Sequence, residues 1–234
     1  MSHGGTGRGF ADLFAKISGR REGSPPHHDQ PQAPAPPEKS LSTKAFGKFL
    51  TALSHRDAPV LLDLGPVVGH NVSFFGERLG CKLVVEDVYA TIDKFARENR
   101  SPELTEFFRT RFPQPDASFD GILCWDILDY LDKSAAQVLA REMTRLLKPG
   151  GALLGFFTTV AAPGPEFTRY HVVDDKTLKH RTVPAARGRQ QVFVNRDINK
   201  MFEGLNVWES FLLLTKIREI VFRKPEIKPA ASAS

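Results

Sequence analysis

The chain has 234 residues, of which 41% are hydrophobic and 25% are charged, and its formal net charge at pH 7 is +5. These values are ordinary for a globular protein and allow one α/β domain with tails. The basic residues are spread along the chain, so no nucleic-acid partner is expected. No apolar run approaches the ~20 residues that cross a bilayer, and no secretory segment opens the chain, so a cytoplasmic location is expected.

The first 42 residues are expected to form a disordered tail, because they are rich in glycine and proline and poor in apolar side chains. One short stripe at helical spacing interrupts this composition and consists of Phe10, Leu13, Phe14 and Ile17. Such a stripe can contact a membrane surface or a protein partner, although a helix this short is only marginally stable alone. The pair His27-His28 is too short to predict a metal site, and no metal is expected.

A folded domain is predicted over residues 43–224, followed by a disordered tail over 225–234. Helical spacing recurs over residues 45–53, 71–79, 91–98, 103–109 and 135–147. Apolar runs typical of buried strands occupy residues 60–63, 81–85, 119–125 and 152–158, and two further strands nearly touch over 208–216 and 218–222. Alternating strands and helices predict a doubly wound α/β fold with a mostly parallel sheet, and the last two strands predict a C-terminal antiparallel β-hairpin.

The strand beginning at Val60 ends in a carboxylate, Asp63, and turns through Gly65 and Gly69. Glycine lets the backbone turn tightly and approach a ligand that a side chain would block. A carboxylate at this turn repels the pyrophosphate of a dinucleotide and favours a cationic ligand instead. The spacing also lacks the Gly-x-Gly-x-x-Gly pattern, which argues against a nicotinamide oxidoreductase.

At these residues the chain resembles the class I S-adenosylmethionine-dependent methyltransferases, whose first motif is acid-x-Gly-x-Gly-x-Gly. Asp63, Gly65 and Gly69 match the acid and the first and last glycines, whereas Val67 replaces the middle glycine and follows Pro66. The resemblance covers about residues 43–224 and implies S-adenosylmethionine as cofactor. Valine resists positive φ, so this departure puts cofactor binding in question.

Further positions of the same resemblance imply cofactor contacts at the ends of two more strands. Glu86 and Asp87 follow the second strand, where the family's acid accepts hydrogen bonds from the ribose hydroxyls, and Asp87 fits that pattern better. Trp125 and Asp126 end the strand over 119–125, whose end faces cofactor and acceptor in the family. No residue is assigned to adenine, because residues 103–115 contain no clear strand.

The resemblance implies methyl transfer to an unknown acceptor, expected to be a small molecule and bound by the long segment over residues 159–204. The arginines of that segment are candidates to bind a carboxylate or phosphate on the acceptor, and the alternative is a solvated basic face; they are Arg169, Arg181, Arg187, Arg189 and Arg196. No catalytic residue is assigned, since positioning an acceptor against an activated methyl group needs no recognisable triad. The alternatives are a non-catalytic binding or scaffold protein of the same fold, favoured by Val67, and an RNA methyltransferase, which no RNA-binding module supports.

Overall fold

The computed structural model describes residues 37–161 and 164–226, so the Phe10–Ile17 stripe and the end of the C-terminal tail lie outside the described residues. A six-stranded sheet forms its centre. The sheet consists, in spatial order, of β3 (Lys82–Val85), β2 (Val60–Asp63), β4 (Phe119–Trp125), β5 (Leu147–Thr158), β9 (Ile217–Arg223) and β8 (Asn206–Leu212). The first four strands are parallel, and β9 pairs antiparallel with both β5 and β8. This order confirms the predicted mostly parallel sheet and its C-terminal hairpin.

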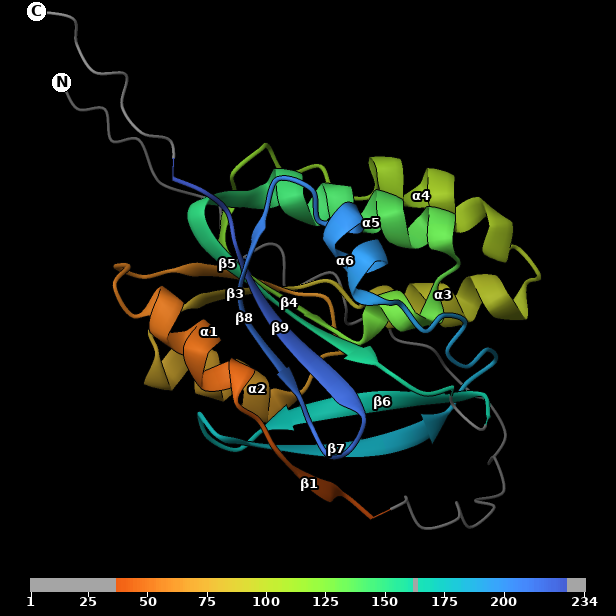
Figure 1. Ribbon diagram of the computed structural model, residues 1–234, viewed down its shortest axis with the longest axis horizontal. Coiled ribbons are helices and arrows are strands. Elements are labelled where there is room, and N and C mark those ends of the chain that lie inside the picture. Colours follow the sequence, from red (N-terminus) through yellow and green to blue (C-terminus); the bar gives the residue numbers. More distant parts are fainter. Residues whose placement is uncertain (1–36, 162–163, 227–234) are drawn as a thin grey trace, which may run out of the picture. The chain divides into compact units, whose positions relative to one another are not determined.

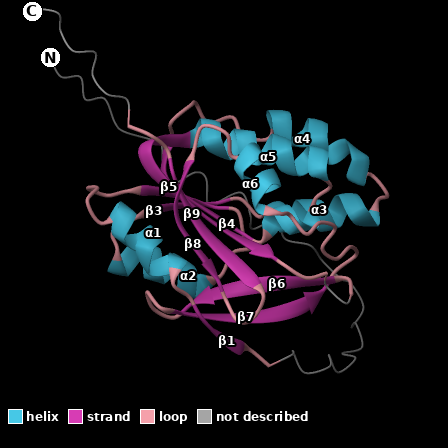
Figure 2. Cartoon of the chain, viewed as in Figure 1, coloured by secondary structure: helices cyan, strands magenta, loops and turns pink. Residues whose placement is uncertain are grey.

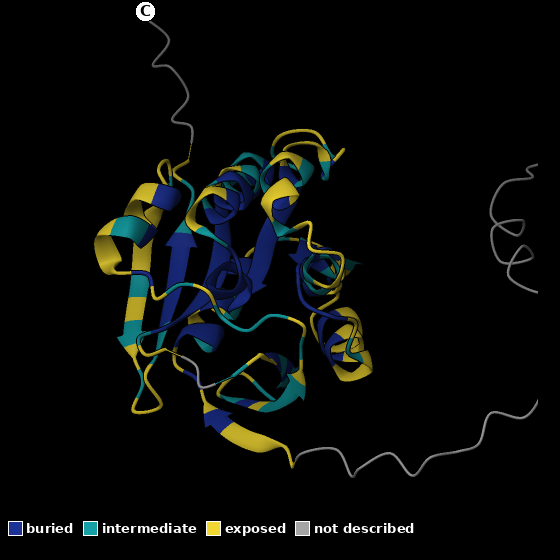
Figure 3. Cartoon of the chain, turned by 90° about the vertical axis from the view of Figure 1, so that its right-hand side faces the viewer, coloured by how far each residue is buried: buried dark blue, intermediate teal, exposed yellow. Residues whose placement is uncertain are grey.

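Helices cover both faces of this sheet (Figures 1 and 2). One face carries α3 (Val88–Arg97), the short turns η3 (Ser101–Glu103) and η4 (Ile127–Tyr130), α4 (Leu104–Thr110), α5 (Lys133–Leu146) and α6 (Asn195–Met201). The other face carries α1 (Ala45–Leu53), α2 (Gly69–Ser73) and the π-helical turn η2 (Phe74–Arg78) that continues it. Figure 3 shows the result, with buried central strands between helices that expose their outer faces.

Local sequence signals explain where the longer helices begin and end. Asp87 and Asp132 are the N-caps of α3 and α5, and their carboxylates accept hydrogen bonds from the backbone N–H groups of Ala90 and Ala135. Apolar residues recur at helical spacing in α5 and bury that face against the sheet. The helix stops at Leu146, ahead of Pro149, which has no N–H to continue it.

No strand lies between α3 and β4, because residues 98–118 form only turns, loops and the helices η3 and α4. The adenine-side strand that the family resemblance implies is therefore missing, and the sheet ends at β3. This agrees with the lack of a clear strand in the sequence of that segment.

A second, three-stranded sheet contains β1 (Lys39–Ser42), β7 (Thr177–Pro184) and β6 (Glu166–Val172), in that order, and we call it the cover sheet. All its pairings are antiparallel. Its main hairpin, β6–β7, comes from the long segment expected to bind the acceptor. Strand β1 lies before the domain start expected at residue 43 and pairs with β7.

Candidate functional site

Asp63 lies at the carboxyl end of β2 and is only 2% exposed. Its Oδ1 atom accepts hydrogen bonds from the backbone N–H of Gly65 at 2.9 Å and from the indole Nε1–H of Trp125 at 2.7 Å. Burial raises the pKa of Asp63 from 3.8 to about 6, against these two hydrogen bonds, which lower it. No cationic side chain of the described residues forms a salt bridge with it, so the carboxylate is buried without a counter-charge.

Trp125 ends β4 with a φ of +49°, a left-handed conformation that bulky side chains rarely adopt. Its indole is 3% exposed and stacks on the ring of Tyr170 from β6, with centroids 5.2 Å apart and planes 9° apart. Phe156 packs edge-on against both rings. We call Trp125 and Tyr170 the aromatic plug, because they fill the space beside the glycine turn.

The glycine turn tolerates valine at its centre. Val67 is 67% exposed and has an ordinary negative φ, so its side chain points to solvent without strain. Gly65 is constrained, because a Cβ atom there would lie 2.9 Å from the Trp125 indole. Gly69 is unconstrained, since a Cβ atom there would meet nothing within 4 Å. The replacement of the middle glycine of the motif by Val67 therefore does not distort the turn.

The two acids after β3 both have partners within the chain. Asp87 caps α3, as described above, and Glu86 forms a salt bridge with Arg111, the residue that follows α4. Their positions next to Asp63 follow from the parallel pairing of β2 and β3, and the Glu86 backbone N–H donates to the Asp63 carbonyl oxygen at 2.8 Å. The predicted acids are therefore brought to one edge of the sheet, although each already serves a structural contact.

Asp126 follows Trp125 and is 2% exposed. Its Oδ2 atom accepts a hydrogen bond from Arg189 Nη2 at 2.7 Å, and Arg189 also donates to Thr168 Oγ1 of β6 at 2.8 Å. Arginines of this segment were expected to bind an acidic group on the acceptor. Arg189 instead binds Asp126, a carboxylate of the chain itself. Asp126 Oδ1 has no hydrogen-bond partner within the described residues, and neither does Oδ1 of Asp129. Burial raises the pKa of Asp129 well above its ordinary value.

Asn71 is a site residue that sequence reasoning missed. It lies in α2, directly after the glycine turn, and is 2% exposed. Its Nδ2 donates to the Tyr170 carbonyl oxygen at 3.3 Å, and its Oδ1 accepts from the Val172 N–H at 2.8 Å. Asn71 thereby holds the cover sheet against the glycine turn. In the sequence, only its position directly after that turn could have indicated a role at the site.

The space enclosed at this site is very small. Its walls include Gly65, Asn71, Trp125, Asp126 and Tyr170, and they surround a cavity of about 10 Å³. That volume is at the lower limit for a single water molecule. The predicted residues therefore converge, and the aromatic plug fills the space between them.

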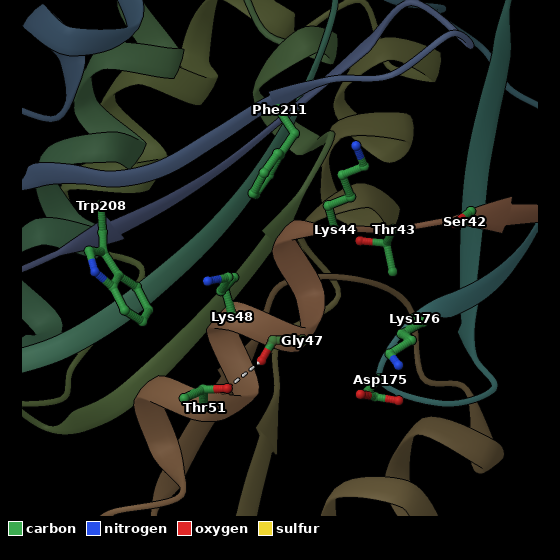
Figure 4. A pocket seen from close by; sticks show the side chains of 10 residues that line it. All are labelled: Ser42, Thr43, Lys44, Gly47, Lys48, Thr51, Asp175, Lys176, Trp208 and Phe211. Carbon is green, nitrogen blue, oxygen red and sulfur yellow. Dashed lines mark hydrogen bonds between the residues drawn. The ribbon is translucent and has the colours of Figure 1, made fainter.

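A larger cavity of about 630 Å³ lies apart from these residues, between α1, β8 and the turn that joins β6 to β7 (Figure 4). It is lined by aromatic and basic side chains, among them Lys44, Lys48, Trp208 and Phe211. None of the predicted site residues lines it. The described residues contain no cluster of three or more potential metal ligands. Among the helices of this part of the chain, none combines the length and the apolarity that a membrane crossing requires.

Comparisons with known proteins find similarity to methyltransferases. Residues 62–155 match the family model of a methyltransferase domain, and no curated protein matches the chain. Similar solved structures include 1,6-didemethyltoxoflavin-N1-methyltransferase of Burkholderia thailandensis, with 16% identity over 78% of each chain and a TM-score of 0.45. The CcbJ methyltransferase of Streptomyces caelestis has 16% identity over 76% of this chain and 93% of its own, with a TM-score of 0.46.

The matched segment runs from β2 to β5 and contains Asp63, both glycines of the turn, the acids after β3 and the end of β4. These are the elements on which the resemblance in the sequence rests. The antiparallel β9-β8 pair lies outside the matched segment. Over residues 62–155 the chain is therefore similar to methyltransferase domains.

Proposed function

We propose that this chain binds S-adenosylmethionine at the carboxyl ends of β2 and β4 and transfers its methyl group to a small-molecule acceptor. The observation that carries this proposal is Asp63, a buried carboxylate without a cationic partner. A buried charge is costly unless it is paired, and a cationic ligand pairs it. Bound S-adenosylmethionine carries both a sulfonium and an ammonium group, and it supplies an activated methyl group.

The polar groups of the site suit this cofactor, whereas the space in the described conformation does not. Asp63 offers an acceptor to an ammonium group, and Glu86 and Asp87 offer acceptors to a ribose diol. Pockets for ligands of this size measure roughly 300 Å³ or more. The cavity of about 10 Å³ is far smaller, so binding requires the aromatic plug to move.

A small-molecule acceptor is favoured because the cover sheet lies over this edge of the central sheet. Hydrogen bonds join it to the site at Asn71 and also at Tyr130, whose hydroxyl oxygen accepts from the Thr168 N–H at 3.2 Å. A compound that reaches Asp126 must therefore fit beneath two strands. A folded protein or a nucleic-acid duplex is too large for that space.

A second candidate function is a non-catalytic binding or scaffold protein. The small cavity and the Trp125 indole against Asp63 favour it, because a site filled by the chain's own side chains needs no ligand.

Calorimetric titration of the full chain with S-adenosylmethionine and S-adenosylhomocysteine separates the two candidates. The proposal expects saturable binding that is lost in Asp63→Asn, which keeps the shape of the side chain and removes its charge. Asp57→Asn is the matched control, because Asp57 is exposed on the turn before β2. Absence of binding to the wild-type chain and to every variant at millimolar ligand would leave the scaffold function as the better account.

A further inference from the structure

The aromatic plug lies where the proposed cofactor would bind. The Trp125 indole donates a hydrogen bond to Asp63 Oδ1, which also accepts one from the Gly65 N–H. The indole lies so close to Gly65 that a Cβ atom there would be 2.9 Å from it. Tyr170 covers its other face. A neutral N–H thus occupies the acceptor that a cationic ligand would use.

Two sets of hydrogen bonds join β6 to residues beside the plug. Asn71 makes two hydrogen bonds to the backbone of β6 around Tyr170. Arg189 joins Asp126, the residue after Trp125, to Thr168 of the same strand. These polar contacts join the cover sheet to the site, and apolar side chains of β6, among them Phe167 and Val172, also pack into the core.

The backbone at Trp125 stores strain in this arrangement. A bulky residue at positive φ is strained, and such residues persist where the surrounding contacts hold them. If the indole leaves Asp63, the backbone of Trp125 is free to relax. Strain of this kind favours a second conformation of the same segment.

We propose that Trp125 and Tyr170 form a displaceable plug, which closes the cofactor pocket in the ligand-free protein and which S-adenosylmethionine displaces from Asp63 when it binds. This inference rests on the proposed cofactor site and describes its regulation. The measured affinity then includes the free energy of displacing the plug, so the apparent affinity is lower than that of an open pocket. Release of Arg189 or Asn71 from β6, for example by an acceptor bound under the cover sheet, raises the cofactor affinity.

The experiment uses the tryptophans as probes, because the chain has only two. Trp208→Phe removes the indole that is 41% exposed on β8 and leaves the 3% exposed Trp125 as the single emitter. This variant is titrated with S-adenosylmethionine while emission and acrylamide quenching are recorded. The plug predicts a red shift and increased quenching on binding, since the indole moves from a buried stack toward water.

The second arm compares cofactor affinities by calorimetry. Trp125→Ala removes the plug and is expected to bind about tenfold or more tightly than the wild-type chain. Trp208→Ala is the matched control, with an affinity equal to that of the wild type. Unfolding in urea shows whether each variant is folded. The fluorescence experiment does not depend on Trp125→Ala, because Trp208→Phe leaves both residues of the plug unchanged.

Each outcome separates the plug from the proposed function. A red shift together with tighter binding by Trp125→Ala supports both. Binding without any change in Trp125 emission, and with equal affinities, refutes the plug and leaves the cofactor site intact. Absence of binding to the wild type, to Trp208→Phe and to a folded Trp125→Ala refutes the cofactor site and the plug with it.

Discussion

Replacing Asp63 with asparagine isolates the effect of one buried charge on stability. The amide keeps an oxygen that accepts from the N–H groups of Gly65 and Trp125, so the local hydrogen bonds persist. What disappears is the ionisation. We therefore expect Asp63→Asn to be more stable than the wild-type chain at neutral pH and to bind S-adenosylmethionine poorly.

The magnitude follows from the pKa of Asp63, which burial raises from 3.8 to about 6. A carboxyl group with a higher pKa in the folded state destabilises that state as pH rises, because the unfolded chain loses its proton first. The cost is absent below pH 3.8 and complete above about pH 6. A shift of this size corresponds to about 3 kcal/mol. The stability gain of Asp63→Asn should therefore grow from about 1.5 kcal/mol near pH 5 to about 3 kcal/mol near pH 8.

Urea unfolding of both proteins from about pH 5 to pH 8 measures this difference. All other titrating groups are common to the two proteins, so their effects largely cancel in the difference. A gain that stays constant with pH, or a variant that is less stable at pH 8, would refute a buried and unpaired carboxylate. A gain in stability joined to a loss of binding would show a residue that serves ligand binding at the expense of the fold.

Four other substitutions test the surrounding structure. Gly65→Ala should destabilise the fold by about 1–3 kcal/mol in urea unfolding, because its Cβ meets the Trp125 indole, whereas Gly69→Ala should be neutral or stabilising by up to about 1 kcal/mol. Asp120→Ala should cost about 1–3 kcal/mol in the same assay, since it leaves two partly exposed cations and a backbone N–H without their carboxylate; a loss below about 0.5 kcal/mol would contradict that role. Val67→Gly should leave cofactor affinity unchanged in calorimetry, because the valine is exposed, and tighter binding would show that valine obstructs the turn.

Much of the central fold could be predicted from the sequence, because β2, β3 and β4 are apolar runs that end in, or are followed by, an acidic residue. Asp63 and the turn after it are local features, and the parallel pairing of neighbouring strands places Glu86 and Asp87 beside them. The sequence indicated that Val67 could impair cofactor binding only because it replaces a glycine of the motif. Whether a valine obstructs depends on where its side chain points, which spacing cannot tell.

The cover sheet could not be predicted in the same way. Strands β6 and β7 contain charged residues between apolar ones, and β1, which pairs with β7, lies more than 100 residues earlier in the chain. Arg189 has no local pattern that links it to Asp126, because their contact depends on how a loop crosses the site. Residues that meet only through tertiary packing leave little trace in one sequence.

Strand β1 has a consequence for how the cover sheet responds to events elsewhere in the chain. It pairs only with β7, and it leads after two residues into α1, which packs on the central sheet. An edge strand of four residues, with one neighbour, is the part of the cover sheet that separates with least loss of hydrogen bonds. Cleavage at residue 43 or a partner that pulls on the residues before 37 would act on this strand first. Strand β1 thus connects the chain before residue 37 to the cover sheet, so that a force on this strand reaches the cover over Asp63.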